Sequence, residues 1–154
     1  MDTKDLLVRF EYFGDVRIEY FDDEKIAVFI SDGNEIKHVD NYINAIKTHF
    51  EKSPNSDLYF CLDISRSRYG LYAVSRFREL HNIVGKRLSG RIAVVIKNDI
   101  IGSSIRIFAD NQLKRHLHER KFFHNRADAI AWLRQGLEQS QISANTYQDG
   151  LPQQ

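Results

Sequence analysis

The spacing of the hydrophobic residues changes after residue 35, and this change limits the folds open to the chain more than any other feature. Before it, three short segments (7–13, 16–20 and 26–30) are rich in alternating or continuous apolar residues. Turn signals separate them, first Gly14-Asp15 and then residues 22–24. Period-two alternation bounded by turn residues predicts an antiparallel three-stranded meander.

Beyond residue 35, predicted helices alternate with predicted strands. Apolar residues spaced by four, three and four positions, as from Val39 to Phe50, predict amphipathic helices. Near-continuous apolar runs of strand length predict strands that helices cover. The predicted helices lie at 36–52, from 71 to a stop at Ser89-Gly90, at about 99–117 and from 126 onward, and the predicted strands at 58–64, 91–96 and 121–123. This order, β-β-β-α-β-α-β-α-β-α, predicts an α/β fold with a mixed, mostly parallel sheet and about four helices.

Length and composition favour a single soluble domain. The chain has 154 residues, of which 42% are hydrophobic and 28% charged. We expect the domain to span residues 1–137 and the polar residues 138–154 to form a flexible tail. One cysteine, no apolar run of the roughly 20 residues that a membrane span requires, and a start without signal-peptide features predict a cytoplasmic location.

Charge is distributed unevenly along the chain. Residues 1–65 carry 14 acidic and 7 basic residues, whereas residues 66–154 carry 7 acidic and 15 basic residues. This asymmetry has two interpretations. The fold could present an acidic face and a basic face, which would favour self-association or a charged partner. Alternatively, the two halves could interleave so that their charges mix on the surface.

Four stretches carry a resemblance to a known family. They are Leu62-Asp63-Ile64-Ser65 at a strand end, Gly70-Leu71 at a helix start, the strand 91–95, and the closing strand and helix 121–133. Together they resemble the STAS domain, and within it the SpoIIAA-like branch of anti-sigma factor antagonists. The resemblance covers residues 35–137. It implies a non-enzymatic regulatory protein that binds a kinase-like partner.

The resemblance also implies a phosphorylated serine, in an Asp-Ser-Ser-Gly-Leu motif. With Gly70 aligned to the glycine of that motif, the phosphorylated serine falls on Arg68, and Ser67 takes the aspartate position. The motif is therefore altered in this chain. A loop shifted by one residue would still offer Ser67 for phosphorylation.

A basic run provides the candidate binding site. Between residues 66 and 91 seven basic residues face a single acid, Glu79. Arginines at the start of a helix can hold a phosphate or carboxylate, because backbone N–H groups there also favour anions. The predicted partner- or anion-binding residues are Asp63, Arg66, Ser67, Arg68, Tyr69 and Gly70. The alternative is a solvated helix face whose arginines pair with the acidic first half.

Other functional classes find little support in the sequence. Cys61 lies inside an apolar run, which predicts an inert core thiol. No acid–base pair, nucleophile motif or metal-ligand spacing is present, so we expect no enzymatic activity, no metal and no cofactor. A pI of about 7.9 and the lack of a recognised motif argue against nucleic-acid binding.

The sequence therefore predicts a regulatory or protein-interaction module. Its 66–70 loop and the following helix would dock onto an acidic or phosphorylated protein partner, including a kinase-like regulator. The alternative is a small-ligand or lipid-binding module, with an apolar pocket between helix and sheet and arginines at its mouth. A homodimer formed through the opening strands is a further expectation.

Overall fold

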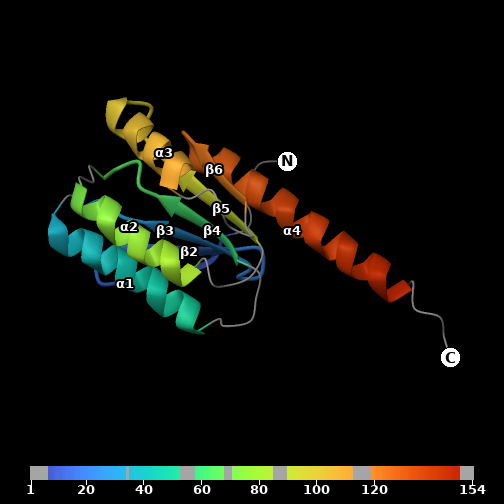
Figure 1. The fold of residues 1–154 in the computed structure, drawn as a ribbon. Helices are drawn as coiled ribbons and strands as arrows, with labels where there is room; N and C mark the ends of the chain where they lie inside the picture. The colour runs from blue at the N-terminus through green and yellow to red at the C-terminus, as the bar shows by residue number, and fades with distance from the viewer. Residues whose placement is uncertain are drawn as a thin grey trace.

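The computed structural model describes residues 7–33, 35–52, 58–67, 71–84, 90–112 and 119–149, which form one six-stranded sheet with four helices (Figure 1). The element order is the predicted one. The elements are β1 (Leu7–Phe13), β2 (Val16–Phe21), β3 (Ile26–Ile30), α1 (Ile36–Lys52), β4 (Leu58–Asp63), α2 (Leu71–Val84), β5 (Gly90–Val95), α3 (Ile100–Gln112), β6 (Glu119–Phe123) and α4 (Arg126–Asp149).

The strands lie side by side in chain order, from β1 to β6. β1, β2 and β3 pair antiparallel, and β3, β4, β5 and β6 pair parallel, which confirms the predicted mixed sheet with its N-terminal meander. A two-residue turn joins β1 to β2. Its first residue, Gly14, has φ 61°, as a type II′ turn requires.

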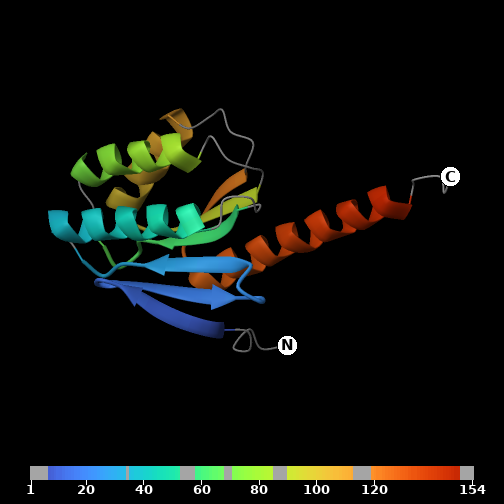
Figure 2. The same cartoon turned by 90° about the horizontal axis from the view of Figure 1, so that it is seen from below.

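The strand order also decides where the helices lie. Because the order never reverses, right-handed crossovers place α1, α2 and α3 on the same face of the sheet. Among the four described helices, only the terminal one, α4, covers the opposite face (Figure 2). Alternate residues of β2 to β6 therefore enter two separate cores. The first core is centred on Ile18, Phe29, Tyr42, Ile46, Phe50, Phe60 and Val94, and the second on Val28, Cys61, Ala93, Val95, Ala129 and Leu133.

A single helix cannot cover one whole face of a six-stranded sheet. α4 packs against β3, β4, β5 and β6, and its C-terminal half runs past the edge of the sheet (Figures 1 and 2). All seven residues of β1 are exposed as a result. Strand β1 thus remains open to solvent along its whole length.

Residues 138–149, for which we expected a flexible tail, continue α4 as a helix. The helix is already started by Asn125, whose side-chain oxygen accepts a hydrogen bond from the backbone N–H of Asp128 at 2.8 Å. Extending an existing helix requires no further nucleation, so even a polar segment can continue it. The side chains of residues 141–146 are exposed. Residues 150–154 lie outside the described residues.

Ion pairs join the acidic first half to the basic second half. They connect acids of β2, β4, α1 and the loops after β2 and β3 to arginines of α2, α4 and the β4–α2 loop. The pairs are Arg126–Glu19, Arg126–Asp63, Arg134–Asp22, Arg76–Asp40 and Arg66–Asp32. The charges of the two halves therefore mix, as the second interpretation of the charge asymmetry proposed.

Candidate functional site

The parallel strands end at a common edge of the sheet, and the candidate site lies there. Ser31 follows β3, residues 64–67 follow β4, residues 96–99 follow β5, and His124 follows β6. In open α/β sheets, ligands usually bind at this edge where the strand order reverses. The six described strands show no such reversal, so the side chains and loops must define any site.

Asp63 anchors the loop after β4. Its Oδ1 accepts hydrogen bonds from the backbone N–H of Ser65 at 3.1 Å and from the Ser65 hydroxyl at 2.6 Å. Its Oδ2 accepts two from Arg126, at 3.0 Å from Nε and 2.7 Å from Nη2. Asp63 is 3% exposed, so its charge is compensated almost entirely by these partners.

The ion pair extends along the α4 side of the sheet to β2. Arg126 Nη1 lies 3.5 Å from Glu19 Oε2, and Arg17 Nε donates to Glu19 Oε1 at 2.8 Å. Glu19 is also buried, at 8% exposure. The four side chains form a line of alternating charge, Arg17–Glu19–Arg126–Asp63. Neither Glu19 nor Arg126 is among the site residues predicted from the sequence. Only their places in the predicted elements distinguish them in the sequence. Glu19 is on the side of its strand opposite the apolar residues, and Arg126 directly follows the residue that caps a helix.

Ser67, the proposed phosphorylation residue, points inward. Its hydroxyl donates to the carbonyl oxygen of Ser31 at 2.8 Å, and the residue is 7% exposed. Two backbone bonds hold the same loop: Ile64 N to Val95 O and Ser67 N to Ile64 O, both at 3.1 Å. A kinase could reach the Ser67 hydroxyl only if this loop opened.

Arg66 has the opposite orientation to its neighbour Ser67. Its side chain is 66% exposed and lies 3.7 Å from Asp32, which is equally exposed. The structure thus brings Asp63, Arg66 and Ser67 to one edge of the sheet. The other predicted site residues, Arg68, Tyr69 and Gly70, lie outside the described residues.

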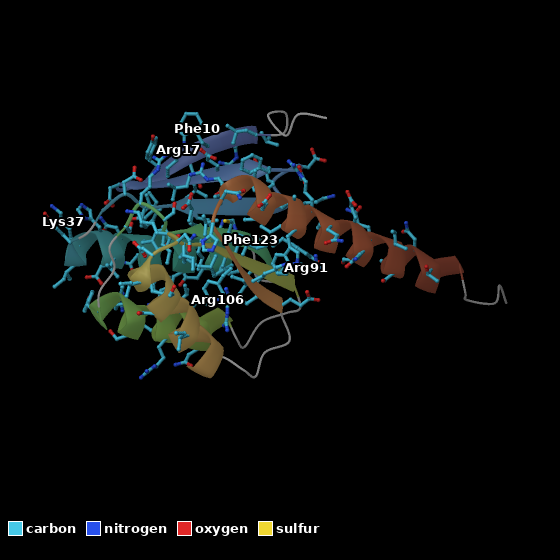
Figure 3. All side chains as sticks on the ribbon, turned by 90° about the horizontal axis from the view of Figure 1, so that it is seen from above. Phe10, Arg17, Lys37, Arg91, Arg106 and Phe123 are labelled. Carbon is cyan, nitrogen blue, oxygen red and sulfur yellow. The ribbon has the colours of Figure 1, made fainter. Side chains whose placement is uncertain are left out.

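Two further arginines of the basic run take part in packing. Arg76, on α2, pairs with Asp40 of α1 at 3.1 Å and with Glu79. Arg91, on β5, lies over the ring of Trp132 at 4.8 Å and donates to its carbonyl oxygen at 2.8 Å; Figure 3 shows it beneath α4. Arg76 thus pairs with an acid of the first half, as the alternative interpretation expects, whereas the acidic partner of Arg91 is Glu119 of the second half.

A pocket of about 290 Å³ opens at the other end of the parallel strands, where β4 begins. Burial lowers the pKa of His49 in its wall, so this imidazole is neutral near pH 7. The described lining residues are Glu24, Lys25, Ala27, His49, Phe50, Leu58, Tyr59, Phe60, Leu137 and Ser140. This part of the wall contains no arginine, and Arg66 lies at the other end of β4.

The described residues supply no obvious reactive or metal-binding group. Burial raises the pKa of the Cys61 thiol far above its ordinary value, as expected for an inert core cysteine. No three His, Cys, Asp or Glu side chains within the described ranges cluster as metal ligands would. Of the helices described, none combines the length and the apolarity needed to cross a membrane.

Comparison with known proteins identifies the fold. No family model and no curated protein matches the chain. Among solved structures, it is similar to an uncharacterized protein from the DUF3478 family with a SpoIIAA-like fold, from Shewanella loihica PV-4. The TM-score is 0.50 at 15% sequence identity, over 86% of this chain and 98% of that chain. At this identity the similarity shows a shared fold, which is the one predicted from the sequence.

Proposed function

We propose that this SpoIIAA-like domain is a non-enzymatic, cytoplasmic protein-interaction module. Its partner would be an acidic or phosphorylated protein, and it would dock at the carboxyl ends of the parallel strands. The partner would contact the loop that follows β4 and the helix α2 beyond it. Electrostatic attraction to the arginines of this loop would guide the encounter.

The orientation of Arg66 is the observation that supports this proposal. Hydrogen bonds to Asp63, Ser31 and Val95 hold the flanking loop residues in place, while the Arg66 guanidinium faces solvent. An arginine on a supported loop loses less conformational freedom on binding than one on an unsupported loop. Its planar fork can then hold a carboxylate or phosphate through two hydrogen bonds.

Reversing the charge of Arg66 tests the proposal. In affinity capture from host lysate, Arg66→Glu should reduce recovery of the specific partner by about tenfold or more, because like charges would then meet at the interface. Arg68→Glu should have the same effect. Recovery would be quantified by mass spectrometry of the captured proteins.

Lys52→Glu is the matched control. Lys52 is exposed at the end of α1, near the point where β4 begins and away from the loop that follows β4. Reversing its charge should therefore leave capture of the partner unchanged. A partner recovered equally by the wild-type protein, Arg66→Glu and Arg68→Glu would mean that docking does not use this loop.

The 290 Å³ pocket favours a second candidate function, the binding of a small ligand. Its volume is near the lower end of the range for ligand sites, about 300–1,000 Å³. Native mass spectrometry of protein purified from its own host should then show a bound mass. That mass should disappear in Ser140→Trp, which would fill the pocket from α4. A wild-type protein without added mass would contradict this function.

A further inference from the structure

Strand β1 leaves one edge of the sheet open and carries apolar side chains along it. β1 has β2 as its only neighbour in the described sheet, so its other side presents unpaired backbone N–H and C=O groups. Phe10 is 50% exposed and Tyr12 is 61% exposed, and Leu7, Val8 and Phe13 are exposed as well. An apolar exposed edge strand is a template for pairing with another strand.

The hairpin geometry shows which backbone groups face outward. Phe13 and Val16 flank the two-residue turn and are opposite each other, so they form a hydrogen-bonded pair. Hydrogen-bonded and non-hydrogen-bonded pairs alternate along an antiparallel ladder. Tyr12 and Phe10, opposite Arg17 and Glu19, therefore direct their backbone N–H and C=O groups to the open edge.

We propose that β1 pairs antiparallel with β1 of a second copy of this chain, with Phe10 opposite Phe10 of the second copy. Residue 10 is the midpoint of the strand Leu7–Phe13, so this register pairs the strand along its full length. It sets Arg9 opposite Glu11 of the second copy, and Glu11 opposite Arg9. It also sets Val8 opposite Tyr12 and Leu7 opposite Phe13.

Charge selects this register among the antiparallel alternatives. Shifting the centre by two residues, to Tyr12, would set Glu11 opposite Phe13 and leave residues 7–10, Arg9 among them, beyond the partner strand. With the centre at Phe10, each charged residue of β1 meets its opposite, and every other residue meets an apolar or aromatic one. The register irregularity between β1 and β2 lies at Leu7–Arg9, toward one end of the strand.

The two aromatic side chains at the centre of β1, Phe10 and Tyr12, are both contacted by Arg17 of β2. Phe10 projects from the face that α4 leaves open, at the rim of the sheet, beside Arg17 (Figure 3). The Arg17 guanidinium lies 4.1 Å from the centre of the Phe10 ring and donates to the Tyr12 hydroxyl at 3.4 Å. The two Phe10 rings would meet at the twofold axis, each held by its own arginine.

Two charge-reversed variants test the proposal through their mixture. Sedimentation velocity over a concentration series should give a dimer for the wild-type chain. Arg9→Glu creates two acid–acid pairs in a homodimer, and Glu11→Arg creates two pairs of arginines. Each variant alone should raise the dimer dissociation constant by about tenfold or more. Mixed in equal amounts, the two should form a heterodimer with opposite charges at both pairs, and the dimer mass should return.

Arg106→Glu is the matched control. Arg106 lies on α3, far from β1 (Figure 3), so its reversal should leave the dimer intact. The mixing experiment distinguishes loss of the dimer interface from misfolding of the variants, because misfolded chains could not form the heterodimer. The proposal is overturned by a wild-type monomer at all concentrations, by single variants that dimerise as the wild type does, or by a mixture that stays monomeric.

Discussion

Replacing Asp63 by alanine should lower the free energy of unfolding by about 3 kcal/mol, the cost of removing one partner from a buried ion pair. The substitution leaves the Arg126 guanidinium, which is only 29% exposed, with Glu19 as its remaining partner. It also removes the acceptor of two hydrogen bonds from Ser65. Urea unfolding followed by the fluorescence of Trp132 would measure the change.

A double-mutant cycle shows whether the Asp63–Arg126 pair causes this loss. Asp63→Asn and Arg126→Met should each destabilise the protein, but the double variant should lose less than the sum of the two, because neither charge is then left unpaired. If Asp63→Ala changed the unfolding free energy by less than about 0.5 kcal/mol, the range of an ordinary surface substitution, the proposed anchor would be wrong.

Gly90→Ala should destabilise the domain by about 3 kcal/mol or more, because the neighbouring backbone leaves no room for a side chain. A Cβ atom at Gly90 would lie 2.1 Å from the carbonyl oxygen of Leu58 on the adjacent strand β4. The φ of Gly90, 153°, is also unfavourable for residues with a side chain. Strand β5 could accept alanine only by moving away from β4, which would disturb the centre of the sheet. Thermal and urea unfolding would report the loss.

Gly136→Ala provides the comparison for that experiment. A Cβ atom at Gly136 would also meet a close neighbour, 2.4 Å away, but that neighbour is the Arg91 side chain, which can move. Alanine also favours a helix over glycine by about 1 kcal/mol, which offsets part of the cost. Gly136→Ala should therefore cost clearly less than Gly90→Ala. Equal unfolding midpoints for the two variants would contradict the close approach of β4 and β5.

Hydrophobic periodicity predicted the element order because it reports a local property, namely which side of each segment is buried. Alternation in 16–20 and the four-three-four spacing in 36–52 each reflect a geometry repeated over a few residues. The same reasoning gave no helix signal beyond residue 137, where α4 continues although the side chains of residues 141–146 are exposed. A helix that is already nucleated and packed at residues 129–133 needs no such stripe to extend.

The candidate site was predictable only where its residues are neighbours in the chain. Asp63, Arg66 and Ser67 lie on one loop, and the strand-end position of that loop was readable from the sequence. Arg126 stands 63 positions after Asp63, and its contact with Glu19 joins α4 to β2. No local pattern marks a pair separated in this way. Part of the charge of buried Glu19 is compensated by Arg126, which comes from a different element of the fold.

The sequence by itself determined the succession of strands and helices, the mixed sheet and the midpoint of β1 at Phe10, because these follow from periodicity and order along the chain. Only the tertiary structure decided which charges are buried, which arginine faces solvent, and which strand keeps an open edge. Those outcomes depend on which strands of the sheet the helices cover. Three crossover helices must share one face of the sheet, so a single helix is left for the other, and it reaches β3 to β6 but leaves β1 exposed.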